Sequence, residues 1–151
     1  MMSQTQSGEW TDSGQINVSP TVDLAFKMLF GVDKNISLTR SLLNSILGHF
    51  DLSLAKNLII INPYIPGSIL DHKAVVLDIL IKDEAQRQIN VEMQVIFKQS
   101  YLKRKLFYAS SLYSKQLKEG EDYQKLKPVI SITFLTERAF PDSEEYIRMG
   151  L

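Results

Sequence analysis

Two apolar runs that each contain a carboxylate constrain the fold of this chain more than any other feature. Asp78 lies in the run at residues 74–81, and Glu92 lies in the run at residues 89–95. Both runs are rich in Val and Ile, which favour β-strands. An ionised carboxylate among apolar neighbours is costly to bury unless a cation or a bound metal compensates it. The two acids therefore mark a candidate site on a predicted sheet.

The polar segment between the two runs, residues 82–88, is short enough to be a hairpin connection. Asp78 and Glu92 are equidistant from Ala85 in the sequence. A turn centred on Ala85 would place the two acids opposite each other, with Cβ atoms about 4.5–5.5 Å apart. Like charges at that separation repel, whereas a shared Mg²⁺ or Mn²⁺ is bound well by carboxylate oxygens. A register shifted by one residue would separate the faces.

An amide follows the second acid at strand spacing. Gln94 lies two residues beyond Glu92, so strand alternation puts both on one face with Asn90, and puts Val91 and Met93 on the other. The resulting pattern is Asp-x13-Glu-x-Gln. A solvated edge strand also gives such alternation, and a carboxylate at a strand end can simply accept backbone or Arg hydrogen bonds.

The remaining periodicity predicts an α/β (α+β) domain, a mixed sheet flanked by helices in the order ααβββαβ. The predicted helices are residues 20–31, 37–47 and 99–119, and the predicted strands are residues 58–62, 74–81, 89–95 and 129–135. The second helix has a predicted buried stripe of Leu38, Leu42, Leu43, Ile46 and Leu47, and the third an apolar stripe of Leu102, Leu106, Ala109, Leu112, Tyr113 and Leu117. Residues 1–19 are polar without periodicity and predict a flexible tail before a single domain at 20–151.

Composition excludes several classes of protein. The 151 residues, 44% of them hydrophobic, suffice for one compact core. The absence of cysteine excludes disulfide frameworks, thiolate zinc sites and thiol nucleophiles. No apolar run reaches the ~20 residues of a membrane span, and no signal peptide is visible, so we expect a cytoplasmic protein. The formal net charge is zero, so any binding of nucleic acid must come from a local patch.

The order of these elements, with Asp followed by Glu-x-Gln and then a long basic helix, resembles the PD-(D/E)XK nuclease superfamily, specifically its Rpn-like branch of recombination-promoting nucleases and putative transposases. The resemblance runs from about Pro20 to about Thr136. Further stretches that carry it are residues 23–31, residues 42–47, Arg104 with Tyr108, and Gly120 with Tyr123 ahead of residues 126–130. The resemblance implies a restriction-endonuclease-like fold and a metal-dependent DNA endonuclease linked to recombination or transposition.

The acid pair and the resemblance together predict the roles of the site residues. Asp78 and Glu92 would bind Mg²⁺ or Mn²⁺, together with the backbone carbonyl of Met93. Gln94 would orient the attacking water. In the resembling family an acid on the first helix lies near the metal, which makes Asp23 a candidate third carboxylate.

Candidate contacts to DNA lie on two of the predicted helices. Arg104, Tyr108 and Lys115 recur at helical spacing and could form a stripe that contacts phosphates, although such a stripe is also the ordinary solvated side of a helix. Lys27 is a further candidate. One turn from Asp23, it is alternatively half of a pair on the helix surface.

Two other functions stay open. Members of the resembling family usually continue well beyond the point where this chain stops at Leu151, so a shortened, catalytically weak relative could act as a DNA-binding or protein-interaction module. A purely structural domain predicts that Asp78 and Glu92 are paired with Arg or Lys and that no cation binds. A homodimer is plausible, because a double-strand cut needs two sites.

Overall fold

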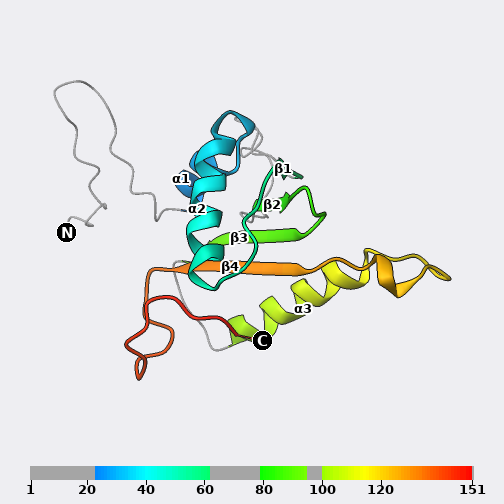
Figure 1. The fold of residues 1–151 in the computed structure, drawn as a ribbon. Helices are drawn as coiled ribbons and strands as arrows, with labels where there is room; N and C mark the ends of the chain where they lie inside the picture. The colour runs from blue at the N-terminus through cyan, green and yellow to red at the C-terminus, as the bar shows by residue number, and fades with distance from the viewer. Residues whose placement is uncertain (1–22, 62–78, 95–99, 151) are drawn as a thin grey trace, which may run out of the picture.

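The computed structural model describes residues 23–61, 79–94 and 100–150 (Figure 1). The predicted tail at residues 1–19 and the acid Asp78 lie outside the described residues. The described elements are α1 (Asp23–Phe30), α2 (Ile36–His49), β1 (Ile59–Ile60), β2 (Ile79–Lys82), β3 (Gln88–Gln94), α3 (Ser100–Ser114) and β4 (Val129–Leu135), with short 3₁₀ turns at Asp33–Asn35 and Tyr123–Lys125. Their order confirms the predicted ααβββαβ. In the part of the chain described, no helix is long and apolar enough to cross a membrane.

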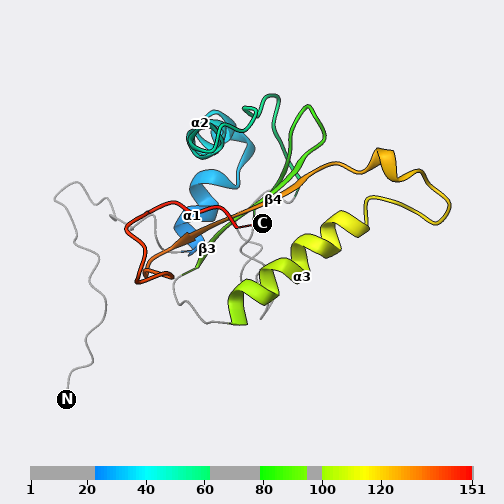
Figure 2. The same ribbon diagram turned by 60° about the horizontal axis from the view of Figure 1, so that its bottom comes forward.

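The four strands form one mixed sheet in the order β1-β2-β3-β4. β1 pairs antiparallel with β2, β2 pairs antiparallel with β3, and β3 pairs parallel with β4. Two parallel neighbours need a crossover connection, and here α3 provides it. Figures 1 and 2 show the outcome: α1 and α2 cover one face of the sheet, and α3 lies on the other.

β2 and β3 form the predicted hairpin. Ile79 pairs with Val91, and Lys82 pairs with Gln88, a register that confirms the predicted centre at Ala85. Period-two alternation then directs the odd-numbered residues of both strands to the face that α1 and α2 cover.

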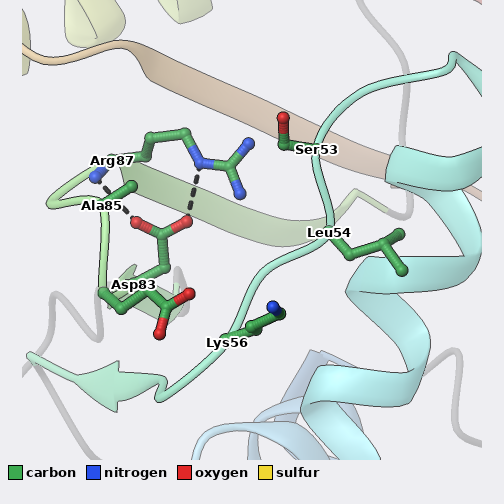
Figure 3. A pocket seen from close by; sticks show the side chains of 7 residues that line it. Ser53, Leu54, Lys56, Asp83, Ala85 and Arg87 are labelled. Carbon is green, nitrogen blue, oxygen red and sulfur yellow. Dashed lines mark hydrogen bonds and ion pairs between the residues drawn. The ribbon is translucent and has the colours of Figure 1, made fainter.

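An acid and a base close the hairpin turn. The Asp83 carboxylate accepts hydrogen bonds from the Arg87 backbone N–H at 2.9 Å and from its Nε at 2.6 Å (Figure 3). Asp83 is buried. Gln86 adopts a φ of 64°, in the left-handed region, which ends the turn before the strand resumes. These bonds hold the register from the turn end of the hairpin.

The core lies between the sheet and the two N-terminal helices. It contains Leu43 and Leu47 of α2 against Ile89 and Val91 of β3, all almost fully buried. Burying one such side chain contributes about 1.5–3 kcal/mol. On α1, Phe26 closes this core with a ring contact to β4.

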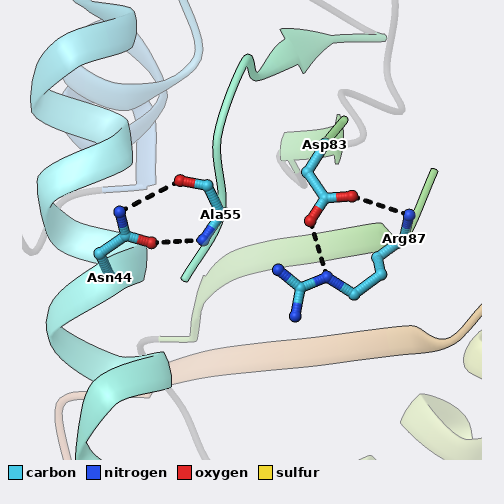
Figure 4. A network of polar contacts seen from close by, with 4 residues as sticks. All are labelled: Asn44, Ala55, Asp83 and Arg87. Atoms are coloured by element: carbon cyan, nitrogen blue, oxygen red, sulfur yellow. Dashed lines mark hydrogen bonds and ion pairs between the residues drawn. The ribbon is translucent and has the colours of Figure 1, made fainter. Parts of the chain in front are cut away.

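A side chain of α2 ties the following loop to the helix. The Asn44 amide donates to the Ala55 carbonyl at 3.1 Å and accepts from the Ala55 N–H at 2.7 Å (Figure 4). Ala55 is completely buried, so its backbone groups need these partners. Leu38, predicted in the buried stripe of this helix, is exposed instead. It lies in the first turn of α2, where Thr39 makes the buried contact to α1.

α1 ends at Phe30, directly before Gly31, the residue predicted for the exit from this helix. The Gly31 N–H donates to the Lys27 carbonyl at 2.8 Å, and a Cβ added at Gly31 would lie only 2.7 Å from that same oxygen. The Phe30 carbonyl accepts a hydrogen bond from the Thr39 hydroxyl of α2 at 2.8 Å. The glycine therefore lets the chain turn tightly between the two helices.

α3 differs from the prediction in length and in the face that it buries. It ends at Ser114 because the chain leaves the helix where the Gln116 amide bonds both backbone groups of Lys127. Half of the predicted apolar stripe is exposed, with Leu106 at 69%, and the other half is only partly buried. The buried residues are Tyr101 and Lys105. The physical reason is that the sheet face opposite α3 carries polar side chains, whereas the apolar side chains of β3 point to the other face.

Candidate active site

Glu92 is buried on β3 with its side chain toward α3. Only 7% of the residue is exposed, and its Oε2 lies 2.6 Å from Nζ of Lys105. Lys105 is equally buried. The predicted alternation is thus confirmed, because Val91 belongs to the core on the opposite face. The cation that compensates Glu92 in this structure comes from α3.

Tyr101 fixes how α3 lies over the sheet. Its hydroxyl is 2.9 Å from the hydroxyl of Thr133, which pairs with Glu92 across β3 and β4. The Lys105 ammonium lies 5.7 Å from the centre of the Tyr101 ring. Residues four apart share one side of a helix, so Tyr101 and Lys105 dock together on this polar face.

Arg104 contacts Gln94, which lies two residues beyond Glu92 on β3. Nη2 of Arg104 donates to Oε1 of Gln94 at 3.4 Å, and its guanidinium carbon lies 5.2 Å from the centre of the Tyr101 ring. Arg104 is exposed, unlike Lys105. The structure therefore brings together three residues predicted for the site, Glu92, Gln94 and Arg104.

Two further predicted DNA contacts lie away from this cluster. Tyr108 is 52% exposed on α3, where its ring packs edge-on against Phe107. Lys115 is exposed just beyond the end of α3 rather than inside it. Both side chains are accessible to a ligand in solution.

The two predicted residues of α1 are less exposed than expected. Lys27 is buried, so the alternative of a pair on the helix surface is wrong. Asp23 has one carboxylate oxygen, Oδ1, that is buried and accepts no hydrogen bond within the described part of the chain. Loss of solvent raises the pKa of this carboxyl above its usual value. A buried carboxylate oxygen of this kind suits a cation.

The donor chemistry fits a hard divalent cation, although the residues described do not complete a set. Within residues 23–61, 79–94 and 100–150, no three His, Cys, Asp or Glu side chains gather where they could hold a metal ion. Glu92 and Asp23 each offer carboxylate oxygens, which Mg²⁺ prefers. Asp78, the predicted partner of Glu92, lies outside the described residues.

A depression at the other end of the hairpin is separate from this cluster. It is lined by Ser53, Leu54, Lys56, Asp83, Glu84, Ala85 and Arg87 (Figure 3). Of its two acids, Asp83 already bonds Arg87 and closes the turn. The polar face of β3 under α3 is therefore the stronger candidate.

Comparison with known families agrees with this geometry. The mixed sheet, with an acid and an amide two residues apart on a central strand and a basic helix over them, is the arrangement of a nuclease-like α/β domain. A family model described as PD-(D/E)XK nuclease family transposase matches residues 20–149, and the chain belongs to that family. No curated protein and no solved structure matched the chain.

Membership in this family implies a nuclease linked to transposition, with DNA as the substrate. Nucleases of the PD-(D/E)XK class generally use a divalent metal.

Lys105 is the residue that the sequence analysis missed. It falls between Leu102 and Leu106 of the apolar stripe and outside the polar stripe that begins at Arg104. A usable signal existed: a buried Glu92 demands a cation, and Lys105 lies one turn from the aromatic Tyr101 on the same side of the helix.

Proposed function

We propose that this chain is a metal-dependent endonuclease that hydrolyses phosphodiester bonds in DNA during recombination or transposition. The observation that carries the proposal is the polar face of β3. There Glu92 and Gln94 lie two residues apart, and α3 places Lys105 against the first and Arg104 against the second. Acidic and amide oxygens beside two cations suit a metal and a phosphate.

The second metal ligand in this proposal is Asp78. The hairpin register runs from Lys82 opposite Gln88 to Ile79 opposite Val91. In the sequence, Asp78 and Glu92 are equidistant from Ala85, on which this register is centred, and the two carboxylates are proposed to share a cation. The backbone carbonyl of Met93 and the carboxylate of Asp23 are the further proposed ligands.

The side chains divide the chemistry among them. A bound Mg²⁺ or Mn²⁺ supplies Lewis acidity and lowers the pKa of a coordinated water. Gln94 orients the attacking water through its amide, which cannot accept the proton at neutral pH. Arg104 stabilises the charge that develops on the phosphate, and Tyr108 positions the strand. Lys115 is a further proposed DNA contact, whereas Lys27, which is buried on α1, stays a prediction from the sequence.

Bond changes in the proposed reaction balance as a hydrolysis. The water oxygen forms a bond to phosphorus, and the bond from phosphorus to one sugar oxygen breaks. The proton that the water loses passes to solvent, and the departing oxygen takes one up.

A homodimer and a cytoplasmic location stay predictions from the sequence.

A second candidate function is favoured by one specific contact. A purely structural module without metal predicts a protein cation on Glu92, and Lys105 is such a cation at 2.6 Å. In that case no divalent metal binds Glu92, either in place of Lys105 or beside it. Activity of the purified chain separates the two candidates.

The test is nicking of supercoiled plasmid by the purified chain with Mg²⁺ or Mn²⁺. Asp78→Ala and Glu92→Ala should each abolish nicking, because each removes a proposed metal ligand. Glu119→Ala, which removes an exposed acid beyond α3, is the matched control and should nick like the unaltered chain. Folded protein that never nicks DNA would instead favour the module without metal.

A further inference from the structure

α3 carries two exposed aromatic rings next to each other. Phe107 is 70% exposed and Tyr108 is 52% exposed. The centres of their rings lie 5.8 Å apart, with the ring planes at 68°. An aromatic side chain contributes to stability mainly through the area that it buries, so two exposed rings contribute little to the fold. Apolar residues that are exposed singly are ordinary, whereas two adjacent rings form a patch that a ligand can cover.

Cations lie at both ends of this pair of rings along one side of the helix. Arg104, Phe107, Tyr108 and Lys115 have the spacing i, i+3, i+4 and i+11, which places them on one side of a helix. The Lys115 N–H donates to the Ser111 carbonyl at 3.1 Å, so helical geometry continues as far as Lys115. We call these four residues the aromatic stripe.

The charges of α3 differ from those of an ordinary solvated helix. Residues 100–114 contain cations and no Asp or Glu. A helix side that simply faces water usually carries charges of both signs. Both cations of the aromatic stripe are exposed, so their charge is available to an anionic ligand. The aromatic stripe therefore suits a ligand that is itself both aromatic and anionic.

The aromatic stripe begins at the candidate active site. Nη2 of Arg104 donates to Oε1 of Gln94 on β3, and from there the stripe extends about 16 Å along the helix axis. Figure 2 shows that α3 lies on the sheet face opposite α1 and α2, so neither of these helices covers it. A DNA strand with a phosphate near Gln94 can therefore continue along α3.

The two rings suit unpaired bases better than paired ones. In a duplex the faces of each base are covered by its neighbours in the stack, so a protein side chain reaches only the backbone and the groove edges. An unpaired base offers its flat face to an aromatic ring, while nearby cations contact the phosphates of the same strand. Because the ring planes meet at 68°, one base cannot lie parallel to both rings. Each ring would take a different base.

We propose that the aromatic stripe binds a single-stranded segment of DNA beside the cleavage site. Phe107 and Tyr108 each stack on one base, and Arg104 and Lys115 contact phosphates. The proposal rests on the nuclease function proposed above, and it names the substrate as DNA with unpaired bases near the scissile bond. Phe107 is then a residue that determines which DNA structure is bound.

The experiment measures binding of the full chain to a short labelled single strand of mixed sequence and to the duplex of the same sequence. Fluorescence anisotropy without added metal gives both Kd values and prevents cleavage. Phe107→Leu keeps an apolar side chain but removes the ring, whereas Phe107→Tyr keeps the ring. Leu106→Ala is the control, because Leu106 is 69% exposed on another side of the same helix. All these positions are exposed, so the Tm of each variant should match that of the unaltered chain.

We expect Phe107→Leu to raise the Kd for the single strand about tenfold, the effect of losing one stacked base, and the Kd for the duplex less than about twofold. Phe107→Tyr and Leu106→Ala should bind both DNAs like the unaltered chain. With Mg²⁺, the unaltered chain should cleave a duplex that contains an unpaired bubble faster than a fully paired duplex. Phe107→Leu should reduce that ratio of rates.

Two binding results would overturn the proposal: Phe107→Leu binds the single strand as tightly as the unaltered chain, or it loses the same affinity for both DNAs. The exposed rings would then suit a protein partner instead. Neither result affects the nuclease function, which nicking of plasmid by the unaltered chain tests separately. Binding of single strands that depends on Phe107, by a chain that never cleaves DNA, would support the binding site and overturn the nuclease function.

Discussion

Glu92 is 7% exposed in the middle of a strand, so the energetics of one carboxylate dominate the site at the scale of single residues. Its pairing with Lys105 is not by itself evidence of stabilisation, because desolvation of two charges can exceed their attraction. The same burial makes the pair sensitive to the loss of either partner. Asp23 has a buried oxygen that accepts no hydrogen bond from the residues that the structure describes.

Removal of one member of the pair should cost far more than removal of both. Glu92→Leu leaves the Lys105 ammonium buried beside apolar groups, and we expect a loss of about 3 kcal/mol in the free energy of unfolding. Glu92→Leu combined with Lys105→Met should recover most of that loss. Urea unfolding of both single variants and the double variant measures the coupling. Additive losses would show that the two side chains do not act as a pair.

Asp23 predicts a pH dependence of opposite sign to that of a salt-bridged acid. Burial raises the pKa of Asp23 in the folded protein above the ordinary value of 3.8. Below the pKa of the unfolded chain the group is protonated in both states and costs no stability. Above the folded-state pKa it is charged in both states, and burying that charge lowers the stability of the folded protein. Asp23→Asn should therefore raise Tm near pH 7, with the difference disappearing at about pH 3. Saturating Mn²⁺ should narrow the difference at pH 7 if Asp23 is a ligand. A lower Tm for Asp23→Asn at pH 7 would contradict this account.

At the scale of elements, each strand of the hairpin has two different faces. Odd-numbered residues of β3 pack on α1 and α2, whereas Glu92 and Gln94 face α3. The junction of α1 and α2 supports the core face, and it depends on the close approach of Gly31 to Lys27.

Gly31→Ala tests that junction. The added Cβ would lie 2.7 Å from a backbone oxygen that cannot move without disturbing α1, so we expect a loss of about 1–3 kcal/mol. Gly48→Ala is the control: its Cβ would meet the Leu54 side chain at an ordinary 3.8 Å. That change lies inside α2 and should stabilise the protein by about 0.5–1 kcal/mol. Thermal unfolding of the two variants should give shifts of opposite sign.

At the scale of the whole molecule, positive and negative charges are equal in number, so binding depends on where the cations lie. The formal net charge is zero, so the global field does not attract DNA. The cations near the polar face of β3 are local: Arg104 at its edge and Lys105 beneath α3. Binding should therefore involve few phosphates, and its affinity should fall only gradually as the salt concentration rises.

Arg104→Ala tests this local origin of binding. Without added Mg²⁺, the slope of log K against log salt for duplex DNA should shrink in magnitude by about 0.9, the value for one lost phosphate contact. Arg138→Ala removes an exposed arginine near the C-terminal segment, where it lies over the Tyr146 ring, and should leave the slope unchanged. Fluorescence anisotropy at four salt concentrations measures both. Equal slopes for the two variants would argue against Arg104 as a phosphate contact.

The sequence by itself determined the order of elements, the centre of the hairpin at Ala85 and the face that Glu92 and Gln94 share. These features follow from periods of 2 and 3.6 residues and from turn chemistry, which are local. It also determined the family. The roles of Asp78 and the other proposed ligands stay predictions.

Only the tertiary structure decided which side of α3 is buried and which cation reaches Glu92. An apolar stripe normally predicts the buried side of a helix, but α3 lies on a polar sheet face and buries Tyr101 and Lys105 instead. That rotation depends on contacts between residues far apart in the sequence. No local period encodes it, because it depends on the side chains that β3 and β4 together present to the helix.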